Sequence, residues 1–169
     1  MSKENQKSTE AHLNSSTKIS ELLELVSFKI GNEEFGVDIS NVKEIIKMLQ
    51  ITKVPNSPDF VEGVINLRGR VIPVIDLRSK LQIEKKKEDK DTRIIVVELN
   101  DNTVGFIVDA VKEVLRIPAS ITEAPPEMVT GYNSDFIQSV GKLEDRLLIL
   151  IDLSKVLTTK EHEELSTAA

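Results

Sequence analysis

Apolar and polar residues alternate along most of the chain in short runs that end at glycine, asparagine or charged residues. Alternation with a period of two and many β-branched residues is typical of strands with one buried face. The pattern predicts strands in both halves of the chain, joined by regular turns. They span 23–31, 33–39, 43–52, 61–67 and 70–77, then 91–99, 103–111, 112–118, 137–143 and 146–153.

One stretch, ISNVKEIIKML (39–49), also fits a helix. Its residues Ile39, Val42, Ile46 and Leu49 follow a spacing close to 3.6, whereas the rest of the neighbourhood alternates. The strand interpretation, with one helical turn before it, is preferred, and a helix stays open as the alternative.

The two halves of the chain repeat each other in order. FGVDISNVKEII (35–46) matches VGFIVDAVKEVL (104–115), and DFVEGVINLRGRVIPVIDL (59–77) matches DFIQSVGKLEDRLLILIDL (135–153). A shorter pair, ITKVP and ITEAP, lies between these blocks. Three ordered blocks indicate two copies of one β module, divided at the charged run 84–91. Because a module this small buries a modest share of its surface, we expect the copies to pack on each other.

The repeat predicts a mainly β fold of two tandem five-stranded barrels, with short helical turns and a short C-terminal helix. The first barrel would span 19–90 and the second 91–158, together forming one domain. Residues 1–18 are strongly polar and are expected to form a disordered tail. Residues 159–169 are also polar and are expected to be a tail or a frayed helix end.

Composition and charge narrow the choice of partner. The formal net charge of −6 argues against a nucleic-acid backbone or an anionic membrane. The chain has no cysteine, which excludes disulfides, thiolate metal sites and a cysteine nucleophile. Its longest apolar runs, such as LLILI (147–151), are far shorter than the roughly 20 residues that span a bilayer. We therefore expect a soluble cytoplasmic protein without direct membrane insertion.

Catalytic and metal-binding patterns are weak. His12 and His162 lie in the polar end segments, where we expect both to be solvated. Asp76 and Asp152 each precede a short stretch of helical character, so N-capping is preferred over acid–base chemistry. We expect no enzyme activity, no metal and no cofactor, with an unconventional carboxylate site kept as the alternative. Binding to other proteins is the function that remains.

Comparison of the two copies singles out residues of the hairpin after residue 60. Arg68-Gly69 forms its turn, and Arg68 matches Glu144, so folding does not require arginine there. Arg68 is therefore a candidate binding residue, and an ordinary solvated arginine is the alternative. Gly63 has a serine counterpart and indicates a bulge or the close approach of another chain. Arg70 recurs as Arg146, which favours a shared structural role such as an ion pair.

The pattern F-x-I-G-x-E-E-F-G-V-D-I-x-x-V-x-E-I (28–45), followed by VPNSPDFVEGVINLRGRVIPVIDLR (54–78), resembles the CheW family of bacterial chemotaxis coupling proteins. RLLILIDLSKVL (146–157) is also typical of that family. The resemblance covers about 22–158 and implies two SH3-like barrels packed together. It implies a non-catalytic adaptor for signal transduction, recruited to membrane receptor arrays.

The partners implied by the resemblance are the cytoplasmic helical hairpin of methyl-accepting chemoreceptors and the regulatory domain of the CheA histidine kinase. Contacts between copies of CheW in arrays are a further expectation. By position in the family motifs, Val42, Glu44, Ile45 and Arg68 would form the receptor-binding surface, and Gly63 would affect coupling to kinase or receptor. Another tandem SH3-like interaction scaffold is the alternative function.

Overall fold

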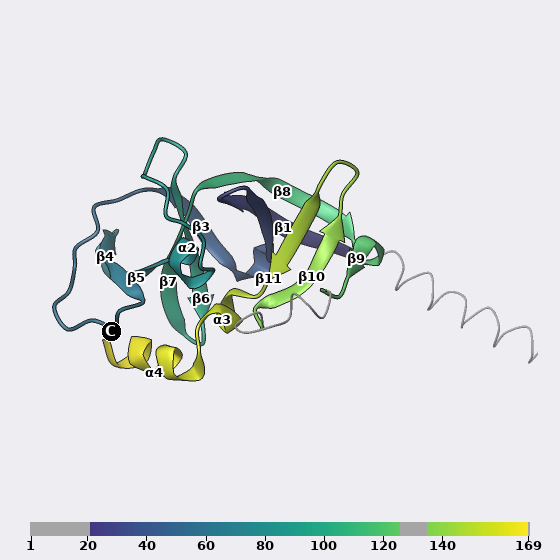
Figure 1. The fold of residues 1–169 in the computed structure, drawn as a ribbon. Coiled ribbons are helices and arrows are strands. Elements are labelled where there is room, and N and C mark those ends of the chain that lie inside the picture. The colour runs from purple at the N-terminus through teal and green to yellow at the C-terminus, as the bar shows by residue number, and fades with distance from the viewer. Residues whose placement is uncertain (1–20, 126–134, 169) are drawn as a thin grey trace, which may run out of the picture.

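The structure is a computed structural model, and it describes residues 21–125 and 135–168 (Figure 1). The expected disordered tail at 1–18 lies outside the described residues. Strands dominate these residues, which confirms the mainly β fold. The strands are β1 (Leu22–Ile30), β2 (Glu33–Asp38), β3 (Val42–Lys47), β4 (Val61–Leu67), β5 (Arg70–Asp76), β6 (Arg93–Leu99), β7 (Asn102–Val108), β8 (Ala110–Pro118), β9 (Thr122–Glu123), β10 (Ile137–Lys142) and β11 (Leu147–Ile151).

The helices are short and follow the strands at their ends. The stretch 39–49 is a single 3₁₀ turn followed by strand β3, so the strand interpretation is correct and the helical one is wrong. Asp76 and Asp152 are N-caps, each accepting a hydrogen bond from a backbone N–H two residues on. The helical elements are η1 (Ile39–Asn41), α2 (Leu77–Lys80), η2 (Ala119–Ile121), α3 (Leu153–Val156) and α4 (Thr159–Ala168).

The strands form two sheets, and each sheet takes strands from both halves of the chain. One sheet has the order β8-β1-β2-β11-β10-β9, here called sheet A, and the other has the order β3-β6-β7-β5-β4, here called sheet B. The first hairpin of each half, β1–β2 or β6–β7, therefore completes the sheet built from the other half. The strands are not divided between the sheets as 19–90 and 91–158. The chain crosses between sheets at η1 and at Asp109 (Figure 1).

The pairing registers repeat as the sequence does. β2 runs parallel to β11, and its counterpart β7 runs parallel to β5. Each half has a β-bulge at matching positions: Lys43 and Lys112 are extra residues in β3 and β8, and Glu62 and Gln138 are extra in β4 and β10. Each half thus has two bulges at equivalent places, and the strand order β8-β1-β2-β11-β10 of sheet A matches β3-β6-β7-β5-β4 of sheet B with the halves exchanged.

The largest apolar cluster lies between the two sheets. Alternate residues of one strand point to opposite faces of the sheet. Ile95 and Val97 of β6 therefore face sheet A, while Ile94 and Val96 lie on the other face of sheet B and pack in a second apolar cluster. Residues on both faces of the exchanged hairpins are therefore buried, which explains the continuous apolar run of Ile94–Val97 in β6. The rings of Phe28 and Phe35 from sheet A stack in this layer. The other buried strand residues of the layer are Val26, Ile30, Val37, Ile75, Ile95, Val97, Leu99, Val104, Phe106, Val108 and Ile151.

A buried ionic cluster ties the crossing at Asp109 to sheet B and to the β1–β2 turn. The Arg78 guanidinium donates to Asp76 at 2.9 and 3.0 Å, to Asp109 at 3.1 Å and to the Lys86 carbonyl at 2.6 Å. Asp109 also accepts from the N–H of Gly31, in the β1–β2 turn, at 2.7 Å. The bond to Asp76 is the main cause that raises the pKa of Arg78. The charged run 84–91, expected to be a solvated linker or a broad loop, thus contributes a backbone carbonyl to this cluster.

Pseudo-equivalent arginines reach the exchanged hairpins. Arg146 pairs with Glu34 of β2, which also accepts from Ser27, and Arg70 donates to Thr103 of β7 at 3.2 Å. Thr103 occupies the position in the second copy that Glu34 occupies in the first. The shared structural role expected for the two arginines is therefore found, as an ion pair for Arg146 and as a hydrogen bond for Arg70.

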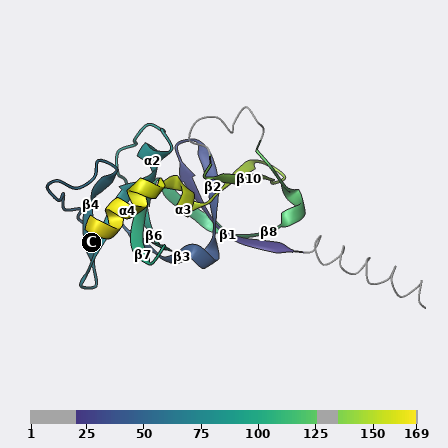
Figure 2. The same cartoon turned by 90° about the horizontal axis from the view of Figure 1, so that it is seen from below.

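The segment 159–169 was expected to be a tail or a frayed helix, yet residues 159–168 form a docked helix. Thr158 and Glu161 make a capping box, in which Glu161 accepts from the Thr158 N–H at 2.9 Å and its own N–H donates to Thr158 Oγ1 at 3.1 Å. Leu165 is buried against the core. Figure 2 shows α4 leaving α3 at the centre of the molecule and running towards β4. Within the described residues, no helix is long and apolar enough to cross a membrane.

Replacing Arg78 with alanine should lower the free energy of unfolding by about 3–5 kcal/mol, because two buried carboxylates lose their cation. Chemical denaturation at neutral pH measures the change. Arg116→Ala is the control, since Arg116 takes part in an exposed ion pair with Glu24 and should change stability by less than about 0.5 kcal/mol. Equal effects of the two substitutions would contradict the structural role of the cluster.

Stability should fall in acid partly through Glu34. Burial acts to raise the pKa of Glu34, but the hydrogen bonds from Ser27 and Arg146 and the charge of Arg146 outweigh it and hold the pKa below its ordinary value of 4.5. The unfolded chain therefore binds the proton first, so this stabilisation is complete above the ordinary pKa and is lost as pH falls through the folded one. Glu34→Gln should lower the free energy of unfolding at pH 7. It should also reduce the fall of this free energy with decreasing pH in acid. The exposed neighbour Glu33→Gln should leave that fall unchanged, and a parallel loss in both variants would refute the assignment.

Candidate protein-binding surface

The turn between β4 and β5 presents Arg68 to solvent. Arg68 and Gly69 both adopt positive φ, 51° and 86°, which is the geometry of the tight hairpin turns that match strand twist. The Asn66 side chain accepts from the Gly69 N–H at 2.9 Å and supports the turn. The Arg68 side chain is 74% exposed and donates to both carboxylate oxygens of Glu44, at 2.8 and 3.1 Å. This bond is the main cause that raises the pKa of Arg68.

The bulge in β3 decides which predicted residues share a face. Val42 pairs with Val97 and Ile45 with Ile95, so both side chains lie on the face of sheet B that is turned towards sheet A. Glu44 pairs with Val96, on the opposite face. Without the extra residue Lys43, a spacing of three would have placed Val42 and Ile45 on opposite faces.

The four predicted binding residues therefore form two groups. Glu44 and Arg68 lie together beside a shallow groove of about 200 Å³, whereas Val42 and Ile45 lie on the other face of the same strand. Ile45 is 39% exposed, and Val42 is partly buried against the layer between the sheets. The sequence did not indicate that the other groove residues belong to this surface, because repeat spacing does not show which residues share one. They are Lys43, Leu67, Arg70, Ile72, Val96 and Thr103.

Gly63 lies where the chain approaches itself. The segment after β3 returns to β4 through a bridge in which the N–H groups of Thr52 and Val64 each donate to the other residue's carbonyl, at 2.9 and 2.8 Å. A Cβ at Gly63 would lie 2.5 Å from the Thr52 carbonyl oxygen and 2.6 Å from Ile51 Cγ2. The bulge expected at Gly63 is confirmed, and the backbone that comes close is the chain's own.

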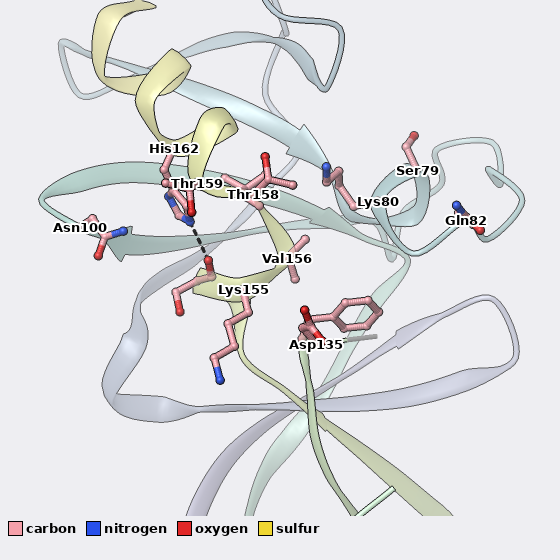
Figure 3. A pocket seen from close by; sticks show the side chains of 13 residues that line it. Ser79, Lys80, Gln82, Asn100, Asp135, Lys155, Val156, Thr158, Thr159 and His162 are labelled. Atoms are coloured by element: carbon pink, nitrogen blue, oxygen red, sulfur yellow. Dashed lines mark hydrogen bonds between the residues drawn. The ribbon is translucent and has the colours of Figure 1, made fainter. Parts of the chain in front are cut away.

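A larger cavity of about 920 Å³ lies between α2, α3, the start of α4 and the β6–β7 turn (Figure 3). Polar side chains dominate its lining, including Ser79, Asn100 and Thr158. His162 lies at its edge, partly buried, with Nε2 donating to the Ser154 carbonyl at 2.6 Å, so its expected solvation is wrong. In 21–125 and 135–168, no group of three or more His, Cys, Asp or Glu residues could hold a metal ion.

Known proteins match this architecture over most of the chain. The family described as CheW-like domain matches residues 24–161. The chain belongs to the CheW-like family. Chemotaxis protein CheW of Klebsiella aerogenes is 39% identical over 138 residues, covering 82% of this chain and 83% of the relative. Chemotaxis protein CheW of Thermotoga maritima is 41% identical over 143 residues, covering 82% and 91%.

A solved structure gives the same result for the fold. The crystal structure of the scaffolding protein TtCheW from Thermoanaerobacter tengcongensis aligns with a TM-score of 0.75 and 41% identity, covering 83% of this chain and 97% of that one. The CheW-like fold is therefore shared with this scaffolding protein.

Replacing Gly63 with alanine should lower the free energy of unfolding by about 1–3 kcal/mol, because the new methyl group would overlap the Thr52 backbone and force β4 or its partner to shift. Thermal or chemical unfolding measures the change. Ser139→Ala is the matched control, since the equivalent bulge of β10 already carries a side chain. The close-approach argument fails if Gly63→Ala is as stable as the wild-type protein.

Proposed function

We propose that this chain is a non-catalytic chemotaxis adaptor that links the cytoplasmic tips of chemoreceptors to the CheA histidine kinase. Its membership in the CheW-like family supports this role, and the names of its relatives describe chemotaxis proteins and a scaffold. The exposed Arg68–Glu44 pair on sheet B is the observation of its own structure that carries the proposal. Binding requires no bond-making step, so surface complementarity alone has to supply the specificity.

Arg68 suits a contact that forms and breaks. An exposed ion pair contributes roughly 0–1 kcal/mol, so Arg68 can leave Glu44 for a receptor group at small cost. The planar guanidinium can make two parallel bonds to a carboxylate, or bind a backbone carbonyl at a helix end. Glu44 meanwhile holds the long side chain over the groove, which reduces the conformational entropy lost on binding.

Val42 and Ile45 suit the apolar part of a helical partner. They lie near each other on the face of β3 that is turned towards sheet A, and Ile45 remains substantially exposed there. A receptor helix with an apolar stripe could rest against this edge while its polar side reaches Arg68 around the strand. Val42, Glu44, Ile45 and Arg68 are thus proposed as one receptor-binding surface that wraps the edge strand.

Contact with the kinase is proposed to use the sheets themselves. The resemblance implies that the regulatory domain of CheA has the same fold, so adaptor and kinase would meet through related sheet surfaces. The same surfaces would allow contacts between copies of the adaptor in arrays. Gly63 supports coupling in this proposal by holding β4 against Thr52, which sets the shape of sheet B beside the Arg68 turn.

Replacing Arg68 with alanine should weaken binding to a receptor hairpin fragment by about 1–3 kcal/mol, the usual loss for a charged hydrogen bond, while the unfolding free energy stays nearly constant. Isothermal titration calorimetry measures the affinity. Glu144→Ala changes the pseudo-equivalent turn of sheet A and serves as the matched control. Unaltered receptor affinity in Arg68→Ala would remove Arg68 from the binding surface. Failure of the wild-type chain to bind receptor and CheA fragments would favour another interaction scaffold.

A further inference from the structure

Side-chain contacts hold helix α4 to the rest of the molecule. Glu161 pairs with Lys80 of α2 at 2.7 and 2.8 Å, and Ser166 accepts from Asn102 of β7 at 3.1 Å. His162 donates to the α3 backbone, as described above. Leu165, only 1% exposed, is the one large apolar side chain in the sequence TKEHEELSTA. None of these contacts is a strand pairing, so α4 can leave without breaking a sheet.

The Leu165 side chain forms part of the wall of an apolar cleft on sheet B. This cleft, of about 270 Å³, lies between the loop before β4 and the strands β4 and β5. Leu165 lines it, and Val71, on its open side, is 70% exposed. The remaining lining residues are Val54, Pro55, Asn56, Ser57, Pro58, Val61, Val64 and Pro73. A leucine side chain from a helix therefore bounds one side of the cleft, and apolar surface of sheet B stays open beside it.

We propose that α4 is a detachable strap and that Leu165 covers apolar surface of sheet B at one side of this cleft. A helix of ten residues is too short to be stable by itself in water, so its order depends on docking. Docking rests on one buried leucine and polar contacts near the surface, which makes local release less costly than global unfolding. Release joins the Leu165 site to the exposed surface around Val71 as one apolar strip. The docked strap thus limits access of other apolar side chains to sheet B.

Hydrogen exchange followed by mass spectrometry on the full chain tests the release. In the wild-type protein, α4 amides should exchange at least about tenfold faster than amides of β6 and β7, which lie in the core. Leu165→Ala should accelerate exchange in α4 by a further factor of about ten or more and leave β6 and β7 unchanged. Lys160→Ala, at an exposed position of the same helix, should alter neither.

The fluorescence of 1-anilinonaphthalene-8-sulfonate tests the occlusion. Leu165→Ala should bind this apolar dye and brighten it severalfold, whereas the wild-type protein and Lys160→Ala should not. Adding Val71→Lys to Leu165→Ala should abolish the gain, because it places a charge on the released strip. The proposal is overturned if α4 exchanges at the rate of the core, if Leu165→Ala accelerates exchange in every strand, or if the dye signal does not depend on Leu165 and Val71.

Discussion

The apolar layer between the two sheets is the constraint on which the rest of the structure depends. A repeat of this size cannot bury enough surface alone, and the chain solves this by exchanging one hairpin between its halves. The strands β1, β2, β6 and β7 then bury residues on both faces. One face packs in the layer between the sheets, and the other packs in an apolar cluster formed within the strand's own sheet. Neither sheet is complete without strands from the other half, so the two units are bound to fold together.

The exchange also explains where charges are buried. The chain must cross between sheets at η1 and at Asp109, and turns at such crossings leave backbone groups without strand partners. Asp109 satisfies the Gly31 N–H at one crossing, and Arg78 balances the carboxylates of Asp109 and Asp76. The pseudo-equivalent position of Arg78 is Ser154, so the second half has no arginine at this place and the ion-pair cluster belongs to one half alone. Repeated backbone geometry thus coexists with side chains that differ between the copies.

The proposed binding surface uses the same divergence. The β4–β5 and β10–β11 turns are equivalent in the repeat, yet one presents Arg68 and the other presents Glu144 and Asp145. The bulges at Lys43 and Lys112 are common to both halves and belong to the fold. Within the proposed surface, Arg68 is a position where the equivalent sites differ, whereas Val42 and Glu44 recur as Val111 and Glu113 in the second copy.

Local patterns along the chain determined the strands, the tight turns, the aspartate caps and the existence of two copies, since these depend on neighbours in sequence. The end segment 159–169 was expected only as a tail or a frayed helix end, and its docking through Leu165 came from the tertiary structure. Only the tertiary structure decided which sheet each hairpin joins, which face Val42 and Ile45 share, and that Gly63 meets Thr52. Strand partners and bulge registers depend on contacts between residues far apart in sequence, and side-chain periodicity carries no information about which partner is chosen.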